Sequence, residues 1–125
     1  MHGTSSWDMR GQSIIRVLAL DNTNERRYYI DMIRSFEDRE TKKIFAGERS
    51  AKIPSDLQNV IRRKLRMLDA AVSREDLRIP PSNHLEKLQG DLNGYSSIRV
   101  NDKYRIIFKW NEGGADHVRV TDYHG

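Results

Sequence analysis

The sequence contains no cysteine, and this absence removes several kinds of chemistry. Disulfides, thiolate metal sites and cysteine nucleophiles are excluded. The four histidines show no spacing typical of metal ligands, and no pair of carboxylates is placed for a two-metal site. Phosphate-binding, dinucleotide-binding and nucleophile-elbow motifs are missing as well. We therefore expect a protein that works with neither a metal nor a cofactor.

Long hydrophobic runs are missing too. The longest apolar run covers residues 14–20, is interrupted by Arg16, and is far shorter than the roughly 20 residues that a membrane span requires. No basic segment leads into this run and no clear small-residue cleavage site follows it, which argues against a signal peptide. We expect no contact with a membrane. The lack of cysteine fits the reducing cytoplasm, where we place the protein.

Charge, by contrast, is abundant. Charged residues make up 32% of the 125 residues, and 22 basic against 18 acidic side chains give a net charge of +4. This balance suits a polyanionic partner such as nucleic acid, and equally an acidic protein partner or an ordinary basic surface. Residues 1–31 hold four basic and four acidic side chains, so the whole excess lies in residues 32–125. We expect residues 32–125 to form the functional domain, with residues 1–31 as an extension that is flexible or not part of the native domain. The alternative is that this extension adds a strand or covers a surface.

The spacing of apolar residues changes along this domain from a helical period to a period of two. Ser55 is the expected N-cap of a long amphipathic helix, and Gly47 ends a shorter helix before it. The polar face of the long helix carries a run of cations, expected to be solvated or to contact phosphates: Arg62, Arg63, Lys64 and Arg66. The predicted elements are a strand over 32–36, helices over 41–46 and 55–72, a strand near 85–88, and strands over 95–100, 104–110 and from 118 onward.

This order predicts an α+β fold, with the two N-terminal helices packed on one face of a small, mainly antiparallel sheet of about four strands. Strand alternation places the apolar side chains on the face that meets the helices. Those residues are Ile98, Val100, Tyr104, Ile106, Phe108, Trp110, Val118 and Val120. The opposite face collects Arg99, Arg105, Lys109, Arg119 and Tyr123. Such a face is either solvated or occupied by an anion such as an RNA strand, because cations are costly to bury unpaired.

Asp122, Tyr123 and His124 follow beside this cationic face. RNA transesterification needs a base that removes the 2′-OH proton, a cation that stabilises the phosphorane, and an acid that protonates the departing 5′-oxygen. A histidine can exchange a proton near neutral pH, a tyrosine hydroxyl can orient a phosphate, and an aspartate can fix the charge state of the histidine. By alternation His124 falls on the apolar face, so it has to bend over the end of the sheet. His84 and Glu86 are further candidates for acid–base work.

Several segments together resemble the HigB toxins of the RelE/ParE toxin superfamily. The resemblance runs from Met32 to His124, and the order and spacing of its segments make it specific. Those segments are Met32–Phe36, Lys64–Ala71, Asp76–Arg78, Leu85–Asp91, Gly94–Asn101, Tyr104–Ile106 and Asp122–His124. Residues 1–31 have no counterpart in the resemblance.

The resemblance implies a RelE-like fold and a ribosome-dependent, metal-independent mRNA endoribonuclease that inhibits translation. It implies that the toxin enters the A site of the 70S ribosome, and that a HigA-type helix-turn-helix antitoxin holds it inactive. Operator DNA is then contacted only through the antitoxin. The alternative on the same fold is a ParE-like toxin, which binds DNA gyrase without catalysis.

The resemblance also implies site residues. Arg105 contacts the scissile phosphate, while Asp122, Tyr123 and His124 take part in cleavage. Some members carry an active-site histidine at the position of Glu86, so either Glu86 or His84 serves as the base here. We expect five cations to bind RNA: Lys87, Arg99, Lys103, Lys109 and Arg119.

Overall fold

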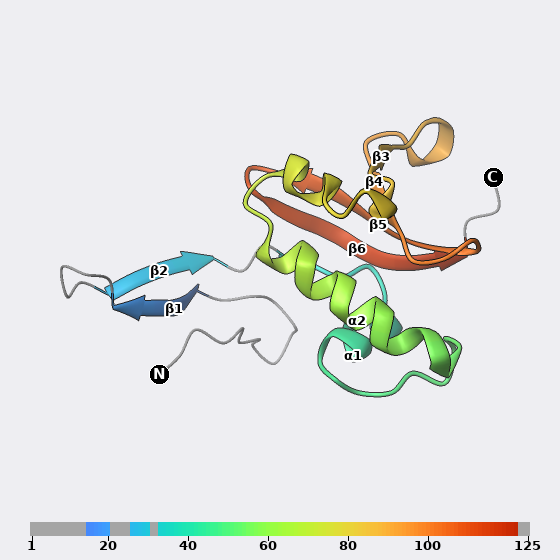
Figure 1. The fold of residues 1–125 in the computed structure, drawn as a ribbon, viewed down its shortest axis with the longest axis horizontal. Helices are drawn as coiled ribbons and strands as arrows, with labels where there is room; N and C mark the ends of the chain where they lie inside the picture. The colour runs from blue at the N-terminus through green and yellow to red at the C-terminus, as the bar shows by residue number, and fades with distance from the viewer. Residues whose placement is uncertain (1–14, 21–25, 31–32, 123–125) are drawn as a thin grey trace.

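The fold was analysed in a computed structural model, which describes residues 15–20, 26–30 and 33–122. Two helices pack against one face of a four-stranded antiparallel sheet, as predicted (Figure 1). Ahead of them, β1 (Ile15–Leu20) and β2 (Arg26–Ile30) form a two-stranded antiparallel sheet of their own. Residues 1–31 were expected to be flexible, to add a strand or to cover a surface, and the part of them that the structure describes forms these two strands. Residues 1–14, 21–25 and 31 lie outside the described residues.

Local polar groups set the start of the first helix and the end of the second. The Asp38 carboxylate accepts a hydrogen bond from the Thr41 N–H at 2.8 Å, so α1 (Arg39–Phe45) starts before its predicted first residue. Helix α2 (Ser55–Ala70) begins directly after Pro54 with no side-chain cap, so the prediction of Ser55 as N-cap is wrong. The helix ends before Val72, because the N–H of Val72 donates instead to Asp76 at 2.9 Å.

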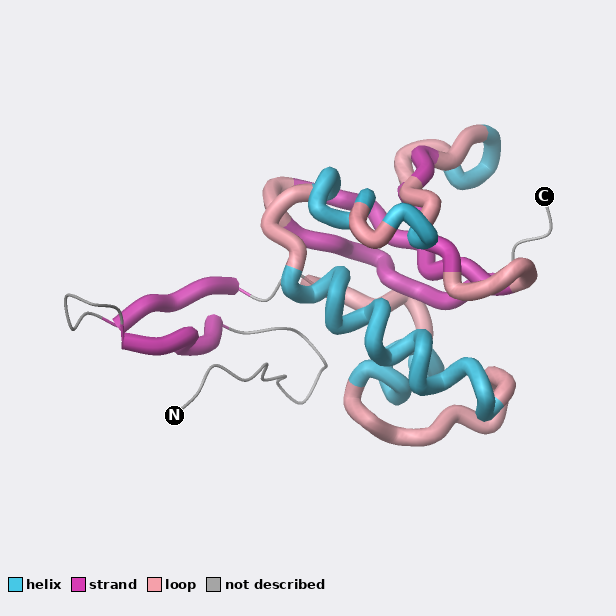
Figure 2. The backbone as a smooth tube through the Cα atoms, in the orientation of Figure 1, coloured by secondary structure: helices cyan, strands magenta, loops and turns pink. Residues whose placement is uncertain are grey.

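The sheet follows the order β3 (Glu86–Lys87), β4 (Ser96–Arg99), β5 (Tyr104–Asn111) and β6 (Gly114–Asp122). Three short 3-10 helices, absent from the sequence prediction, fill the connection from α2 to β4 (Figure 2). They are η1 (Arg74–Arg78), η2 (Pro81–Asn83) and η3 (Gly90–Leu92). No helix in the described ranges is long and apolar enough to cross a membrane.

The predicted first strand over 32–36 is reduced to a short parallel contact with the outer edge of β6. Isolated bridges join Ile33 to Ala115 and Phe36 to Val118. The Arg34 N–H donates to the Ala115 carbonyl at 2.7 Å, which ties the segment to the sheet. We call residues 33–37 the edge segment.

The core lies between the helices and the face of the sheet predicted to be apolar. Its fully buried members include Ile44, Ile61, Leu65, Leu68, Ile98, Ile106, Phe108 and Val118. A register shift interrupts the β5–β6 pairing, and His117 there has a φ of +56°. This irregularity allows Ala115 and Val118, an odd and an even position of one strand, both to be buried in the same core cluster. Val72, the predicted last residue of the long helix, is 72% exposed.

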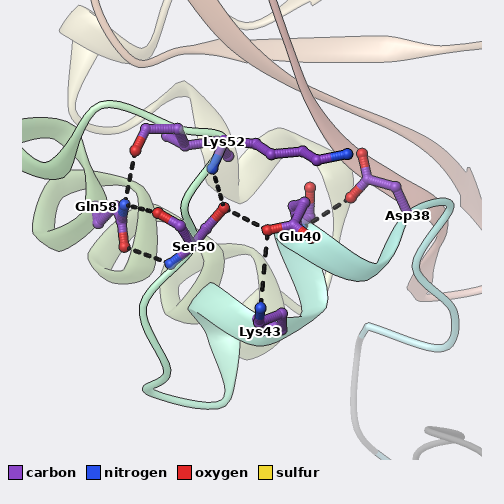
Figure 3. A network of polar contacts seen from close by, with 8 residues as sticks. Asp38, Glu40, Lys43, Ser50, Lys52 and Gln58 are labelled. Atoms are coloured by element: carbon purple, nitrogen blue, oxygen red, sulfur yellow. Dashed lines mark hydrogen bonds and ion pairs between the residues drawn. The ribbon is translucent and has the colours of Figure 1, made fainter.

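The loop between α1 and α2 is held by a polar network around Ser50 (Figure 3). The Ser50 hydroxyl donates to Glu40 at 2.5 Å and accepts from the Lys52 N–H at 3.1 Å. The Gln58 side chain binds both backbone groups of Ser50, accepting from its N–H at 3.0 Å and donating to its carbonyl at 2.7 Å. The hydrogen bond from Ser50, followed by nearby lysines, lowers the pKa of Glu40.

Replacing Ser50 with alanine should lower the melting temperature by roughly 4 °C at neutral pH, because two hydrogen bonds of the loop are lost. The difference in melting temperature between the parent and the variant should become smaller at acidic pH. The folded-state pKa of Glu40 is depressed, so its contribution is present above the pKa of a free glutamate, about 4.3, and is lost as the pH falls through the lowered value. Melting curves of the parent and Ser50→Ala from pH 7 to pH 3 measure this. Ser55→Ala is the control, since no cap bond is lost, and an equal deficit in both variants would contradict the prediction.

Candidate active site and RNA-binding face

Arg105 lies in β5 and is held by three neighbouring parts of the chain. Its Nε donates to the Ser97 hydroxyl on β4 at 2.8 Å, and its Nη2 donates to the His84 carbonyl at 2.8 Å. The same Nη2 lies 3.7 Å from the carboxylate of Glu86 on β3. Only 12% of the side chain is exposed. The guanidinium is therefore fixed in orientation and mostly buried at one end of the sheet, which strand alternation alone did not indicate.

The two candidate bases stand differently toward Arg105. His84 has a left-handed backbone with a φ of +44°, and its main-chain carbonyl, not its imidazole, contacts the arginine. Glu86 pairs with Ser97 across the sheet and brings its side chain to the guanidinium. Between these two residues, Glu86 is the one whose side chain lies at Arg105.

The turn that carries His84 is held in place by hydrogen bonds of two buried polar residues, Lys64 and Asn83. The Lys64 ammonium donates to the Asn83 side-chain oxygen at 2.5 Å, and the Asn83 amide donates to the Leu77 carbonyl at 3.0 Å. Asn83 is fully buried and Lys64 is 6% exposed, so the prediction of a solvated Lys64 is wrong. Burial lowers the pKa of Lys64, and the charges of Arg63 and Arg99 lower it further. The other cations of that run, Arg62, Arg63 and Arg66, are half-buried or exposed.

Of the three C-terminal residues predicted to take part in cleavage, the structure describes only Asp122. Tyr123 and His124 lie outside the described residues. Asp122 ends β6 opposite Tyr104, and its carboxylate lies 3.7 Å from the Lys103 ammonium. Thr121, one residue before it, pairs directly with Arg105. The end of β6 thus runs beside the strand that carries Arg105.

The remaining cations of the outer sheet face are mostly engaged, which the sequence prediction did not include. The Arg99 guanidinium pairs with Asp102, and Arg119 Nε lies 3.3 Å from Glu37. The Lys109 ammonium lies 5.1 Å from the centre of the Tyr95 ring. Lys87, next to Glu86 in β3, is exposed and pairs with no carboxylate in the described part of the chain, and alternation turns its side chain away from this face.

The Glu37 carboxylate contacts three side chains of this face, and the sequence analysis did not predict this role. Its carboxylate accepts a hydrogen bond from the Tyr95 hydroxyl at 2.9 Å and lies 3.5 Å from His117 Nδ1 and 3.3 Å from Arg119 Nε. Burial, and then the contact with Glu37, raise the pKa of Tyr95. Glu37 reaches the face through the parallel pairing of the edge segment with β6. Only that pairing could have signalled its role.

The site residues that the structure describes are suited to general acid–base and electrostatic chemistry. Arg105 offers a fixed cation beside the carboxylate of Glu86, with further cations across the sheet. Within residues 15–20, 26–30 and 33–122, no three histidine, aspartate or glutamate side chains gather in a way that could hold a metal ion. The arrangement can bind a phosphodiester and stabilise charge that develops on it.

Comparison with known proteins places this site in a family. Residues 34–124 match the family described as the RelE-like toxin of the type II toxin–antitoxin system HigB. The chain is 45% identical over 85 residues to Toxin HigB-1 of Vibrio cholerae serotype O1, a match that covers 67% of this chain and 90% of that toxin. It is 31% identical over 93 residues to Endoribonuclease HigB of Proteus vulgaris, which covers 74% of this chain and all of that protein. The chain therefore belongs to the HigB-like toxins, a RelE-like family of type II toxin–antitoxin systems.

Proposed function

We propose that the chain is an mRNA endoribonuclease that cuts messages on translating ribosomes and so inhibits translation in the cytoplasm. The observation that carries this proposal is the fixed guanidinium of Arg105, with Glu86 at 3.7 Å. The name of the Proteus vulgaris relative, Endoribonuclease HigB, supports the choice of RNA as substrate. We assign the activity to residues 32–125.

In the proposed reaction the 2′-OH of one nucleotide attacks the adjacent phosphate, with no metal ion. Glu86 takes the 2′-OH proton, and Arg105 stabilises the negative charge that develops on the phosphorane. His124 gives a proton to the 5′-oxygen as its bond to phosphorus breaks. Tyr123 orients the phosphate, and Asp122 holds the charge state of His124. The products are a 2′,3′-cyclic phosphate and a free 5′-hydroxyl.

The cations around Arg105 are proposed to hold the RNA strand. Lys87 and Lys103 are exposed, and Lys109 lies over an aromatic ring. Arg99 and Arg119 are paired with carboxylates, so a phosphate has to compete with Asp102 and Glu37 for them. We infer that binding weakens as salt increases, because each phosphate contact releases counterions.

The proposed partners follow from the family. A HigA-type helix-turn-helix antitoxin would hold the toxin inactive, and operator DNA would be contacted only through that antitoxin. The A site of the 70S ribosome would present the message to Arg105.

Expression of the free chain in growing bacteria tests the proposal. We expect growth to stop and transcripts to be cut inside ribosome-covered codons, and we expect an Arg105→Ala, His124→Ala double variant to restore growth. A double variant as toxic as the parent would contradict the proposal. DNA damage signalling without cut transcripts would instead indicate a gyrase-binding toxin.

A further inference from the structure

A hollow of about 370 Å³ lies beside β3 and the start of β4. Its volume falls within the range of roughly 300–1,000 Å³ that is common for small-ligand sites. It is lined by Arg74, Lys87, Leu88, Gln89, Asn93, Gly94, Tyr95, Ser96 and Trp110. The lining combines two cations, two aromatic rings, two side-chain amides and a hydroxyl. No step of the proposed cleavage uses this hollow.

Arg74 is held in position on one side of the hollow. Its Nε donates to the Ser96 hydroxyl at 2.8 Å, and its Nη1 donates to Glu75 at 3.0 Å. Only 14% of its side chain is exposed. The remaining nitrogen, Nη2, has no acceptor among the described residues. A guanidinium that is already oriented loses little freedom when it binds a phosphate.

Trp110 supplies the aromatic surface. Its ring packs edge-on against Phe108, with centroids 6.5 Å apart, and the residue is half-buried. The indole N–H donates to no acceptor in the described part of the chain. The N–H of Trp110 is therefore available to a ligand or to water.

The hollow and the proposed cleavage site each include one residue of β3. Glu86 and Lys87 are consecutive, and side chains of consecutive strand residues point to opposite faces. Glu86 points to Arg105, and Lys87 lines the hollow. Because Glu86 and Lys87 are neighbours in this two-residue edge strand, an RNA strand that crosses β3 passes both side chains.

We propose that the hollow binds one nucleotide of single-stranded RNA, next to the nucleotides held at Arg105. The base packs against Trp110, where Gln89 and Asn93 can hydrogen-bond its edge, and a flanking phosphate lies between Arg74 and Lys87. This inference deepens the proposed function and rests on it for the choice of RNA as the ligand. Binding itself requires no cleavage, so the two can fail separately.

The emission of Trp110 reports directly on the hollow. The chain has two tryptophans, so a Trp7→Phe variant of the full chain leaves Trp110 as the sole tryptophan fluorophore. We expect a saturable change in its emission on titration with a 2′-O-methylated trinucleotide, which cannot be cleaved. Arg74→Gln or Lys87→Gln should each raise Kd by about 3–10-fold. An abasic site at one of the three positions should raise it by about 10-fold or more.

Arg78→Gln is the matched control, because Arg78 lies in the same short helix, bears the same charge and does not line the hollow. It should change Kd by less than about 2-fold, with melting curves checking that every variant is folded. Equal effects of Arg74→Gln and Arg78→Gln, or tight binding of a trinucleotide with all bases removed, would overturn the inference. So would displacement of the trinucleotide by a polyglutamate peptide, which would assign the hollow to an acidic protein segment.

The two proposals are separated by Arg105→Ala. This variant should no longer cut RNA, yet should keep the Trp110 signal with an affinity within about 3-fold. A parent that binds the trinucleotide through Trp110 but never cuts RNA supports the hollow and contradicts the endoribonuclease. A parent that cuts RNA with no change in Trp110 emission overturns the hollow alone.

Discussion

Replacing Arg105 with alanine is expected to slow RNA cleavage by about 10²–10³-fold, the loss typical of removing one group that stabilises a transition-state charge. The guanidinium is held by Ser97 and the His84 carbonyl, so little reorganisation is needed when the phosphorane forms. The rate constant for cutting a ribosome-bound message under single-turnover conditions measures the effect. The apparent affinity for the message should change far less, because other cations share the binding.

Two further variants sharpen this prediction. Arg105→Lys keeps the charge but cannot contact Ser97 and His84 together, so we expect it to remain at least about 10-fold impaired. Arg39→Ala removes an exposed arginine from α1, outside the proposed site, and should leave the rate within about 2-fold of the parent. An Arg105→Ala variant that cuts at the parental rate would leave Glu86 without its proposed partner and would contradict the mechanism.

Replacing Asn83 with alanine is expected to destabilise the fold by about 3 kcal/mol, because the buried Lys64 ammonium loses its acceptor. The Leu77 carbonyl loses its donor as well. Urea unfolding at pH 7 measures the change. Asn59→Ala, which removes an exposed asparagine from α2, should cost less than about 0.5 kcal/mol. The Asn83→Ala variant should also cut RNA more slowly, because the turn that presents His84 to Arg105 is loosened.

The ionisation of Lys64 should also make the free energy of unfolding depend on pH in the alkaline range. Burial lowers its pKa, so between that value and the pKa of a free lysine, about 10.4, the unfolded chain binds more protons than the folded one. The stability contribution of Lys64 should therefore rise as the pH increases through this window. Lys64→Met should lack the rise, and identical alkaline profiles for parent and variant would contradict the assignment.

Much of the fold could be predicted, because its signals are local. The alternation of Ile106 and Phe108 fixed the buried face of β5, and the period of the apolar residues located α2. The errors concern residues whose burial or pairing depends on a partner that is distant in the sequence. Lys64 sits among exposed arginines in the sequence, but a turn 19 residues later covers it. The strand predicted over 32–36 is reduced to two bridges, because this segment pairs only with the edge of β6.

The site was less predictable than the fold. Alternation identified Arg105 as a face residue, but nothing in its sequence neighbourhood indicates that Ser97 and a backbone carbonyl hold it. The pairing of Glu37 with Arg119 also depends on strands that meet only in three dimensions. A face that is solvated or occupied by an anion was predicted because alternation assigns side chains to faces without showing the carboxylates that arrive from other parts of the chain.

The parallel contact between the edge segment and β6 has a consequence for synthesis. Ser35 and Asp116, which hydrogen-bond across this contact, are 81 residues apart in the chain. During translation the edge segment therefore emerges long before the strand that receives it. Until β6 is free, the core that Phe108 shares with Ala115 and Val118 is incomplete, and long-range pairing of this kind is slow to form. A nascent chain should thus remain open, and unable to present Arg105 in its final setting, until most of the domain has left the ribosome that makes it.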